Sequence, residues 1–198
     1  MAFFDMAVRK RREHRRMGLS QEDHEAIERL KEAGVLRRIE DHLLDQSHGA
    51  VLVCCSDGDR FCETLGFQAK TQLGHREEPR IHVVAIAGGP LGIPSDSPVN
   101  RVIGWRDADQ YLLAQIRIGV VKKEIPTIIL LPHVPCAMCV AAGLNVYDEM
   151  VLIAEAKRRV QEEFPDADVA CKIHVDYGDR KKTFFFSRPD WEGFRATL

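Results

Sequence analysis

Three short apolar runs constrain the fold of this 198-residue chain more than any other feature. They are GAVLVCC at 49–55, RIHVVAIAGG at 80–89 and PTIILLPHVPC at 126–136. Each run is bounded by glycine, proline or polar residues, a pattern that is typical of a buried strand. Because segments with helical spacing separate the runs, we expect parallel crossovers. The sequence therefore predicts a single α/β domain with a mostly parallel central sheet flanked by helices.

The elements that cover and complete this sheet also leave a pattern in the sequence. Apolar residues recur at helical spacing within 107–124 and within 145–164, which predicts two helices lying against the sheet. The segment CKIHVDYGDRKKTFFF at 171–186 predicts a final hairpin-like pair of strands that turns around Gly178 and Asp179.

The N-terminal part of the chain differs in character, and we expect it to form a helical arm over residues 1–48, ahead of a domain at 49–198. The stretch SQED, starting at Ser20, resembles a capping box and predicts the start of a helix. Apolar residues at helical spacing within 36–43 predict a second helix, separated from the first by Gly34.

The strongest charge block of the chain is RKRREHRR at 9–16. It could contact RNA, an acidic partner or a membrane surface, but we favour a solvated helix face or an arm that packs on a partner subunit. The block has no interleaved aromatic residues for base stacking, and the formal net charge of −2 argues against a chain that binds nucleic acid over its whole surface.

Two features of the sequence indicate where the protein is located and whether it spans a membrane. No apolar stretch approaches the roughly 20 residues that a membrane span requires. The first residues place their charge after a very short apolar segment, the reverse of a secretory signal. We therefore expect a cytoplasmic protein without a membrane partner.

Six cysteines occur as two close pairs and two isolated residues, namely Cys54–Cys55, Cys136–Cys139, Cys62 and Cys171. In a chain without an export signal, reduced thiols are expected, and clustered cytosolic cysteines are more often metal ligands or catalytic groups than disulfides. The isolated cysteines are expected to be packing thiols.

Chemically reactive residues follow the predicted strands at the edge where sites form in open α/β sheets. Cys54 or Cys55 ends the first strand, and His133 and Cys136 end the third. Two thiolates and an imidazole match the ligand preference of zinc, and three protein ligands leave a fourth position open, as in a catalytic site.

Each of these residues also has a purely structural interpretation. Adjacent strand residues face opposite ways, so only one cysteine of the first pair points at a shared site. We assign this role to Cys55, which enters a turn, and a core role to Cys54. Cys139 could extend the set to Cys-x-x-Cys, typical of a redox pair or a closed structural zinc site, but we favour helix packing for it.

The order of these motifs resembles the β-class carbonic anhydrases: Cys-x-Asp at 55–57, IAGG at 86–89 and His-x-x-Cys at 133–136. The resemblance covers roughly residues 50 to 187 and also includes the late strand pair. It implies zinc bound by Cys55, His133 and Cys136 and reversible hydration of carbon dioxide to bicarbonate. It also implies a homodimer, or a higher homo-oligomer, whose N-terminal helices embrace the partner.

The resemblance further implies a catalytic pair of Asp57 with an arginine two residues later, and here the chain departs from the family pattern. Position 59 is Asp59, and Arg60 comes one place late. An Asp at i and an Arg at i+3 can still meet if the loop turns helically. We therefore predict Asp57 and Arg60 as the catalytic pair.

Without an arginine partner, Asp57 could occupy the fourth zinc position, which is an inactive state in that family. The alternatives to a carbonic anhydrase are therefore an inactive, zinc-stabilised binding module and a hydrolase of a related small molecule such as carbonyl sulfide. A third alternative is a thiol redox protein that uses Cys136 and Cys139.

Overall fold

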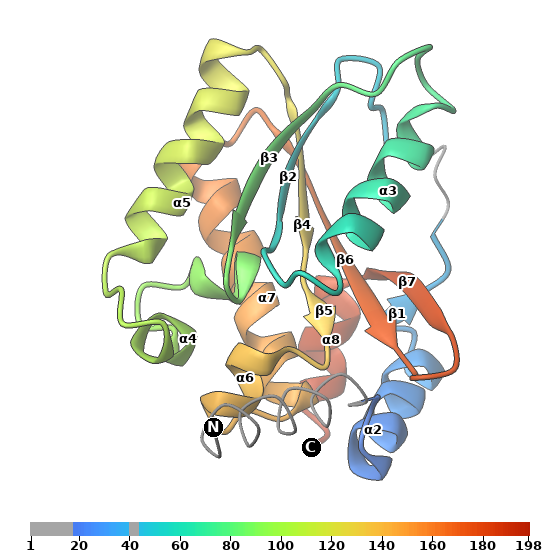
Figure 1. The fold of residues 1–198 in the computed structure, drawn as a ribbon. Helices are drawn as coiled ribbons and strands as arrows, with labels where there is room; N and C mark the ends of the chain where they lie inside the picture. Colours follow the sequence, from blue (N-terminus) through green and yellow to red (C-terminus); the bar gives the residue numbers. More distant parts are fainter. Residues whose placement is uncertain (1–17, 40–43) are drawn as a thin grey trace, which may run out of the picture.

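The computed structural model describes residues 18–39 and 44–198, and its strands form one mixed sheet. The strands are β1 (Leu36–Arg37), β2 (Ala50–Cys55), β3 (Ile81–Ile86), β4 (Thr127–Leu131), β5 (His133–Val134), β6 (Asp168–Asp176) and β7 (Lys181–Phe186). Their order is β1-β7-β6-β4-β2-β3, with β5 also paired to β6 (Figure 1). Strands β2 to β6 pair in parallel, whereas β7 pairs antiparallel with both β6 and β1. The predicted fold class and the final hairpin are thus confirmed.

Helices lie on both faces of this sheet (Figure 1). The helical elements are α2 (Gln21–Glu32), α3 (Phe61–Gln72), a 3₁₀ turn η2 (Gly89–Gly92), α4 (Pro98–Val102), α5 (Ala108–Arg117), a π-helical turn η3 (Ile118–Lys122), α6 (Ala137–Ala141), α7 (Val146–Glu163) and α8 (Arg188–Arg195). The two helices predicted over 107–124 and 145–164 are confirmed as α5 with η3 and as α7. Within the described residues, no helix combines the length and the apolar character that a membrane crossing requires.

Side chains of strand β2 alternate between the faces of the sheet and so contribute to two different hydrophobic clusters of the described residues. Val51, Val53 and Cys55 belong to the larger cluster, which includes residues of α5 and α7. Leu52 and Cys54 belong to the smaller cluster, against which α3 packs. The prediction that the two adjacent cysteines face opposite ways is therefore confirmed.

The N-terminal part of the described chain is only partly helical. The predicted start at Ser20 is confirmed, because its side chain accepts a hydrogen bond from the Asp23 N–H at 3.0 Å and α2 follows. The predicted second helix is wrong at Leu36 and Arg37, which form β1. Gly34 adopts a φ of 73°, after which the chain reaches the sheet and pairs with β7. A sheet edge that accepts a strand overrides local helical spacing. Residues 40–43 and the basic block at 9–16 lie outside the described residues.

Candidate metal centre

The three residues predicted as metal ligands come together at the carboxyl end of the sheet. Cys55 ends β2, His133 lies in β5, and Cys136 directly precedes α6. One sulfur from each cysteine and one ring nitrogen of His133 all lie within 4.8 Å of one another. All three side chains are buried. Because β2 and β4 are parallel neighbours, the segments that follow them meet at one edge, as expected for this fold class.

The imidazole of His133 gives the strongest support for the view that this cluster could hold a metal ion. The residue is 2% exposed, and neither Nδ1 nor Nε2 has a hydrogen-bond partner. Leaving a buried polar group unsatisfied costs about 1 to 3 kcal/mol. A metal ion bound by one ring nitrogen removes part of this cost. The donor set of two sulfurs and one nitrogen fits zinc, so these residues could hold that ion.

Neighbouring thiols and burial raise the pKa values of the two cysteines in the cluster. Contact with Cys139 raises the pKa of Cys136 to about 12, against an opposing effect of its contact with Cys55. Contact with Cys136, followed by burial, raises the pKa of Cys55 above its usual value. Both thiols are therefore protonated at neutral pH when no metal is bound, and a metal ion must displace their protons on binding.

The turn after β3 is built to approach Cys55 closely. The Gly88 N–H donates a hydrogen bond to the Cys55 sulfur at 3.3 Å. Gly88 and Gly89 have φ values of 78° and 55°, in the left-handed region that favours glycine. A Cβ atom on Gly89 would lie 2.5 Å from the Cys55 backbone nitrogen. The paired glycines therefore allow the backbone to supply a donor to a candidate ligand.

Asp57 lies at the rim of the cluster, in the turn between β2 and α3. Its Oδ1 accepts a hydrogen bond from the Asp59 N–H at 2.8 Å, which fixes the side chain in the turn. Its Oδ2 lies 3.9 Å from His133 Nε2, and the side chain is partly exposed. A carboxylate at this place borders both the solvent and the imidazole of His133.

Arg60 does not meet Asp57, although the loop between them does turn helically. The Arg60 N–H donates to the Asp57 carbonyl at 3.1 Å, but the guanidinium forms an ion pair with the buried Asp176 of β6. No ion pair joins Arg60 to Asp57 within the described part of the chain. One helical turn further on, Glu63 forms an ion pair with Lys181 of β7. The start of α3 is thus tied to the β6–β7 hairpin at two points.

The structure adds two residues to the surroundings of the cluster. Cys139 and Glu149 are both buried, and each interacts electrostatically with Cys55 of the cluster. Glu149 interrupts the apolar stripe that Val146, Met150 and Ile153 form on α7. A carboxyl group inside an apolar helix stripe is the sequence signal that could have revealed it.

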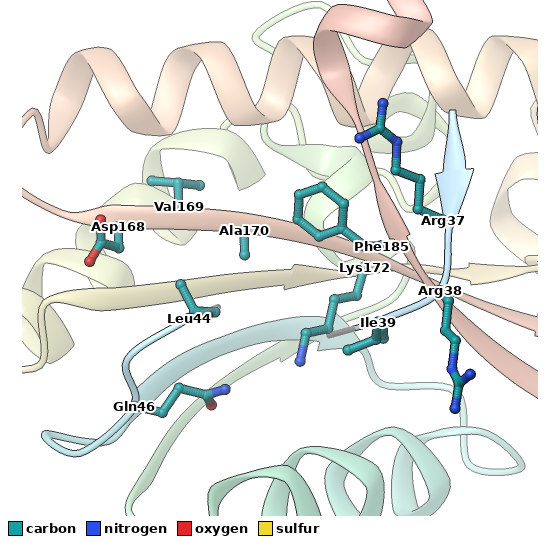
Figure 2. A pocket seen from close by; sticks show the side chains of 10 residues that line it. All are labelled: Arg37, Arg38, Ile39, Leu44, Gln46, Asp168, Val169, Ala170, Lys172 and Phe185. Atoms are coloured by element: carbon teal, nitrogen blue, oxygen red, sulfur yellow. The ribbon is translucent and has the colours of Figure 1, made fainter. Parts of the chain in front are cut away.

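A separate cavity of about 420 Å³ lies away from the candidate metal centre (Figure 2). It is on the face of the sheet that α3 covers, near the N-terminal part of β6. Its lining mixes basic side chains such as Arg38 and Lys172 with apolar ones such as Ala170 and Phe185. None of the three candidate ligands lines this cavity.

No model of a protein family matches the chain, and no curated protein matches its sequence. Among solved structures, it is similar to β-carbonic anhydrase isoform I (TvaCA1) from Trichomonas vaginalis, with 17% identity, a TM-score of 0.37, and coverage of 85% of this chain and 99% of that one. The carbonic anhydrase from Streptococcus mutans matches with 15% identity, a TM-score of 0.37, and coverage of 84% and 99%. The β-carbonic anhydrase CafA of Aspergillus fumigatus matches with 12% identity, a TM-score of 0.34, and coverage of 98% and 97%. All three of these neighbours are carbonic anhydrases. The case for a metal centre in this chain rests on its own side chains.

Proposed function

We propose that this chain binds one zinc ion through Cys55, His133 and Cys136 and catalyses the reversible hydration of carbon dioxide to bicarbonate. The observation that carries the proposal is that one donor atom from each of these three residues lies within 4.8 Å of the other two. In addition, neither ring nitrogen of the His133 imidazole has a hydrogen-bond partner. Three protein ligands leave one coordination position for the reaction, which is the arrangement of catalytic zinc sites.

The chain's own residues have distinct roles in this proposal. Zinc, when bound, supplies the Lewis acidity that makes water a nucleophile at neutral pH. The Gly88 N–H holds the Cys55 sulfur in place. Asp57, with its Oδ2 3.9 Å from His133 Nε2, accepts a hydrogen bond from the attacking water and orients it toward carbon dioxide.

A second candidate function is favoured by the pairing of Arg60 with Asp176. The family resemblance assigns to an arginine the task of holding the catalytic aspartate away from the metal. With Arg60 held by another carboxylate, Asp57 is free to take the fourth coordination position. The chain would then be a zinc-stabilised binding module without catalysis.

Stopped-flow measurement of carbon dioxide hydration by the zinc-loaded full chain separates these functions. Activity that is lost in Asp57→Asn while zinc content is kept supports the enzyme. A chain that holds one zinc but shows no hydration activity at any alkaline pH supports the binding module. In that case Asp176→Asn, which releases Arg60, should produce activity. A chain without zinc contradicts both.

The same preparation answers two related questions. Supplying carbonyl sulfide in place of carbon dioxide tests the hydrolase alternative. Elemental analysis tests the thiol redox alternative, which requires a metal-free protein with an accessible Cys136–Cys139 disulfide.

We further propose a cytoplasmic homodimer in which an N-terminal arm over residues 1–48 contacts the partner. The support for this assembly is the family resemblance, together with the basic block at 9–16 as a candidate contact. Sedimentation equilibrium of the full chain is expected to give twice the mass of 22.4 kDa. A monomeric mass at all protein concentrations contradicts the dimer.

A further inference from the structure

The cavity of about 420 Å³ on the α3 side of the sheet has no part in the proposed reaction (Figure 2). Its volume lies in the range of about 300 to 1,000 Å³ that is typical of sites for small molecules. Such sites combine a largely apolar wall with a few polar groups that fix the orientation of the ligand. The walls of this cavity show both features.

Apolar side chains form one part of the wall. Ala170 belongs to β6 and Phe185 to β7, and Leu44 lies on the segment that leads to β2. All three belong to the smaller hydrophobic cluster or pack against it, so this part of the cavity is continuous with the protein interior. Burial of apolar ligand surface here would contribute about 25 cal/mol per Å². The wall therefore suits the apolar body of a ligand.

Lys172 places a positive charge in the same wall. The residue is only 3% exposed, although lysine is rarely buried. It alternates with Ala170 along β6, so both side chains lie on one face of the sheet. Its Nζ lies 5.3 Å from the centroid of the Phe67 ring of α3, in a cation–π contact. A cation held beside an apolar cavity attracts an anion more strongly than a cation in water does, because the local dielectric constant is low.

Gln46 supplies a second and independent sign of a ligand. The residue is 1% exposed, and its Oε1 accepts a hydrogen bond from Gln68 of α3. Its Nε2 has no hydrogen-bond partner among the residues that the structure describes. Figure 2 shows the amide turned toward the side of the cavity where Lys172 lies. A buried donor without an acceptor costs about 1 to 3 kcal/mol, which an oxygen atom of a ligand would recover.

Charged residues at the two ends give the cavity a direction. Arg38 lies at one end and Asp168 at the opposite end (Figure 2). Arg37, which also lines the cavity, forms an ion pair with Asp190 of α8. A negatively charged head group is therefore favoured near Arg38 and Lys172 and disfavoured near Asp168.

We propose that this cavity binds an organic oxyanion, a carboxylate or a phosphate, that carries an apolar chain of about eight carbon atoms. The head group accepts hydrogen bonds from Lys172 and Gln46 and faces Arg38. The chain lies against Ala170 and Phe185. Because none of the candidate metal ligands lines this cavity, the inference goes beyond the proposed function and does not depend on zinc.

Isothermal titration calorimetry of the full chain with octanoate, octyl phosphate and octanol tests the recognition of the head group. At least one of the two oxyanions is expected to bind with a Kd below about 1 mM, and octanol at least about tenfold more weakly. The tighter of the two oxyanions identifies the preferred head group. Octanol binding as tight as that of both oxyanions would overturn the inference, and so would the absence of binding by either oxyanion.

Two substitutions test the polar wall with the tighter oxyanion. Lys172→Met removes the charge but keeps an unbranched apolar stem, and the affinity should fall at least about tenfold. Gln46→Glu keeps the acceptor for Gln68 but replaces the Nε2 donor with a like charge, so binding should be lost. The matched control is Lys182→Met, because Lys182 also lies over a ring, that of Phe184 at 5.2 Å, but does not line the cavity. This control should bind like the native chain.

Native affinity in both Lys172→Met and Gln46→Glu would overturn the inference. If these variants do not fold, Ala170→Leu provides the test, since it fills the apolar part of the cavity and leaves every charge in place. A folded Ala170→Leu chain should bind at least about tenfold more weakly, and native affinity in it would contradict the site.

Titration of the Cys55→Ser chain separates this site from the metal centre, because carboxylates also bind zinc. Affinity equal to that of the native chain supports the cavity as the site. Loss of binding in Cys55→Ser would show that the oxyanion is bound to the metal and would overturn the inference without harming the proposed function.

Discussion

Cys54 and Cys55 are neighbours in one strand, yet they lie in two chemically different regions. Cys54 is packed among apolar side chains under α3, where burial raises the pKa of its thiol to about 12. Cys55 has a comparable degree of burial but contacts a second thiol, and a backbone N–H donates to its sulfur. Burial alone makes a thiol inert packing, as at Cys54. Convergence of several donor groups is what distinguishes a candidate ligand.

The largest expected difference between the two regions is in metal content. Cys55→Ser and His133→Ala should each reduce the bound zinc from one ion per chain to none, because each removes one of three ligands. Cys54→Ser, the matched control on the same strand, should retain the ion. Elemental analysis after dialysis against metal-free buffer measures both. Equal zinc content in Cys55→Ser and Cys54→Ser would contradict the site.

The second difference is in the tolerance of the backbone around each cysteine. Gly89→Ala should lower the free energy of unfolding by about 3 kcal/mol, since it combines a left-handed backbone with a Cβ 2.5 Å from the Cys55 nitrogen. Gly66→Ala in α3 is the control on the other face, with no atom within 4 Å of its added Cβ. It should stabilise the protein by about 0.5 to 1 kcal/mol. Urea unfolding measures both, and a mild effect of Gly89→Ala would show that the turn is not constrained by Cys55.

A third difference is in the pH dependence of the free energy of unfolding. The buried Glu149 of α7, on the side of the sheet that Cys55 faces, is expected to cause it. The pKa of Glu149 is raised in the folded chain, so the protonated side chain contributes fully to stability only at pH values below its unfolded pKa of about 4.3. This contribution is lost as the pH rises toward the folded pKa. Relative to Glu149→Gln, the native chain should lose up to about 1.4 kcal/mol of unfolding free energy per pH unit above that point. Denaturant unfolding at several pH values measures the difference, and a constant difference would show that Glu149 ionises normally.

The smallest expected effect is a loss of stability in the smaller hydrophobic cluster, which contains Cys54. Cys54→Ala should lower the unfolding free energy by about 1 kcal/mol, because it removes one buried sulfur from a small apolar cluster. Metal content and hydration activity should not change. Calorimetric melting in the presence of zinc checks this, and a loss of activity would place Cys54 in the functional site instead.

The sequence was most informative where chemistry follows a strand. The candidate ligands were predictable because apolar runs define strand ends, and parallel strands bring those ends to one edge. The placement of Cys54 and Cys55 on opposite faces of the sheet followed from the alternation of side chains along a strand. These inferences require only local patterns and a fold class.

Long-range competition was not predictable in the same way. Arg60 and Asp57 have a workable spacing, but Asp176 lies 116 positions after Arg60 and reaches it through the pairing of β6 in the sheet. The strand at Leu36 likewise depends on β7, about 150 positions away. No local pattern shows which of two distant partners a side chain or a segment will choose.

The two ion pairs between the start of α3 and the β6–β7 hairpin have a consequence for the turn that carries Asp57. Arg60 and Glu63 attach that turn to two different strands, at Asp176 and Lys181. The conformational entropy of the turn is therefore lost when the protein folds and not when a small molecule arrives.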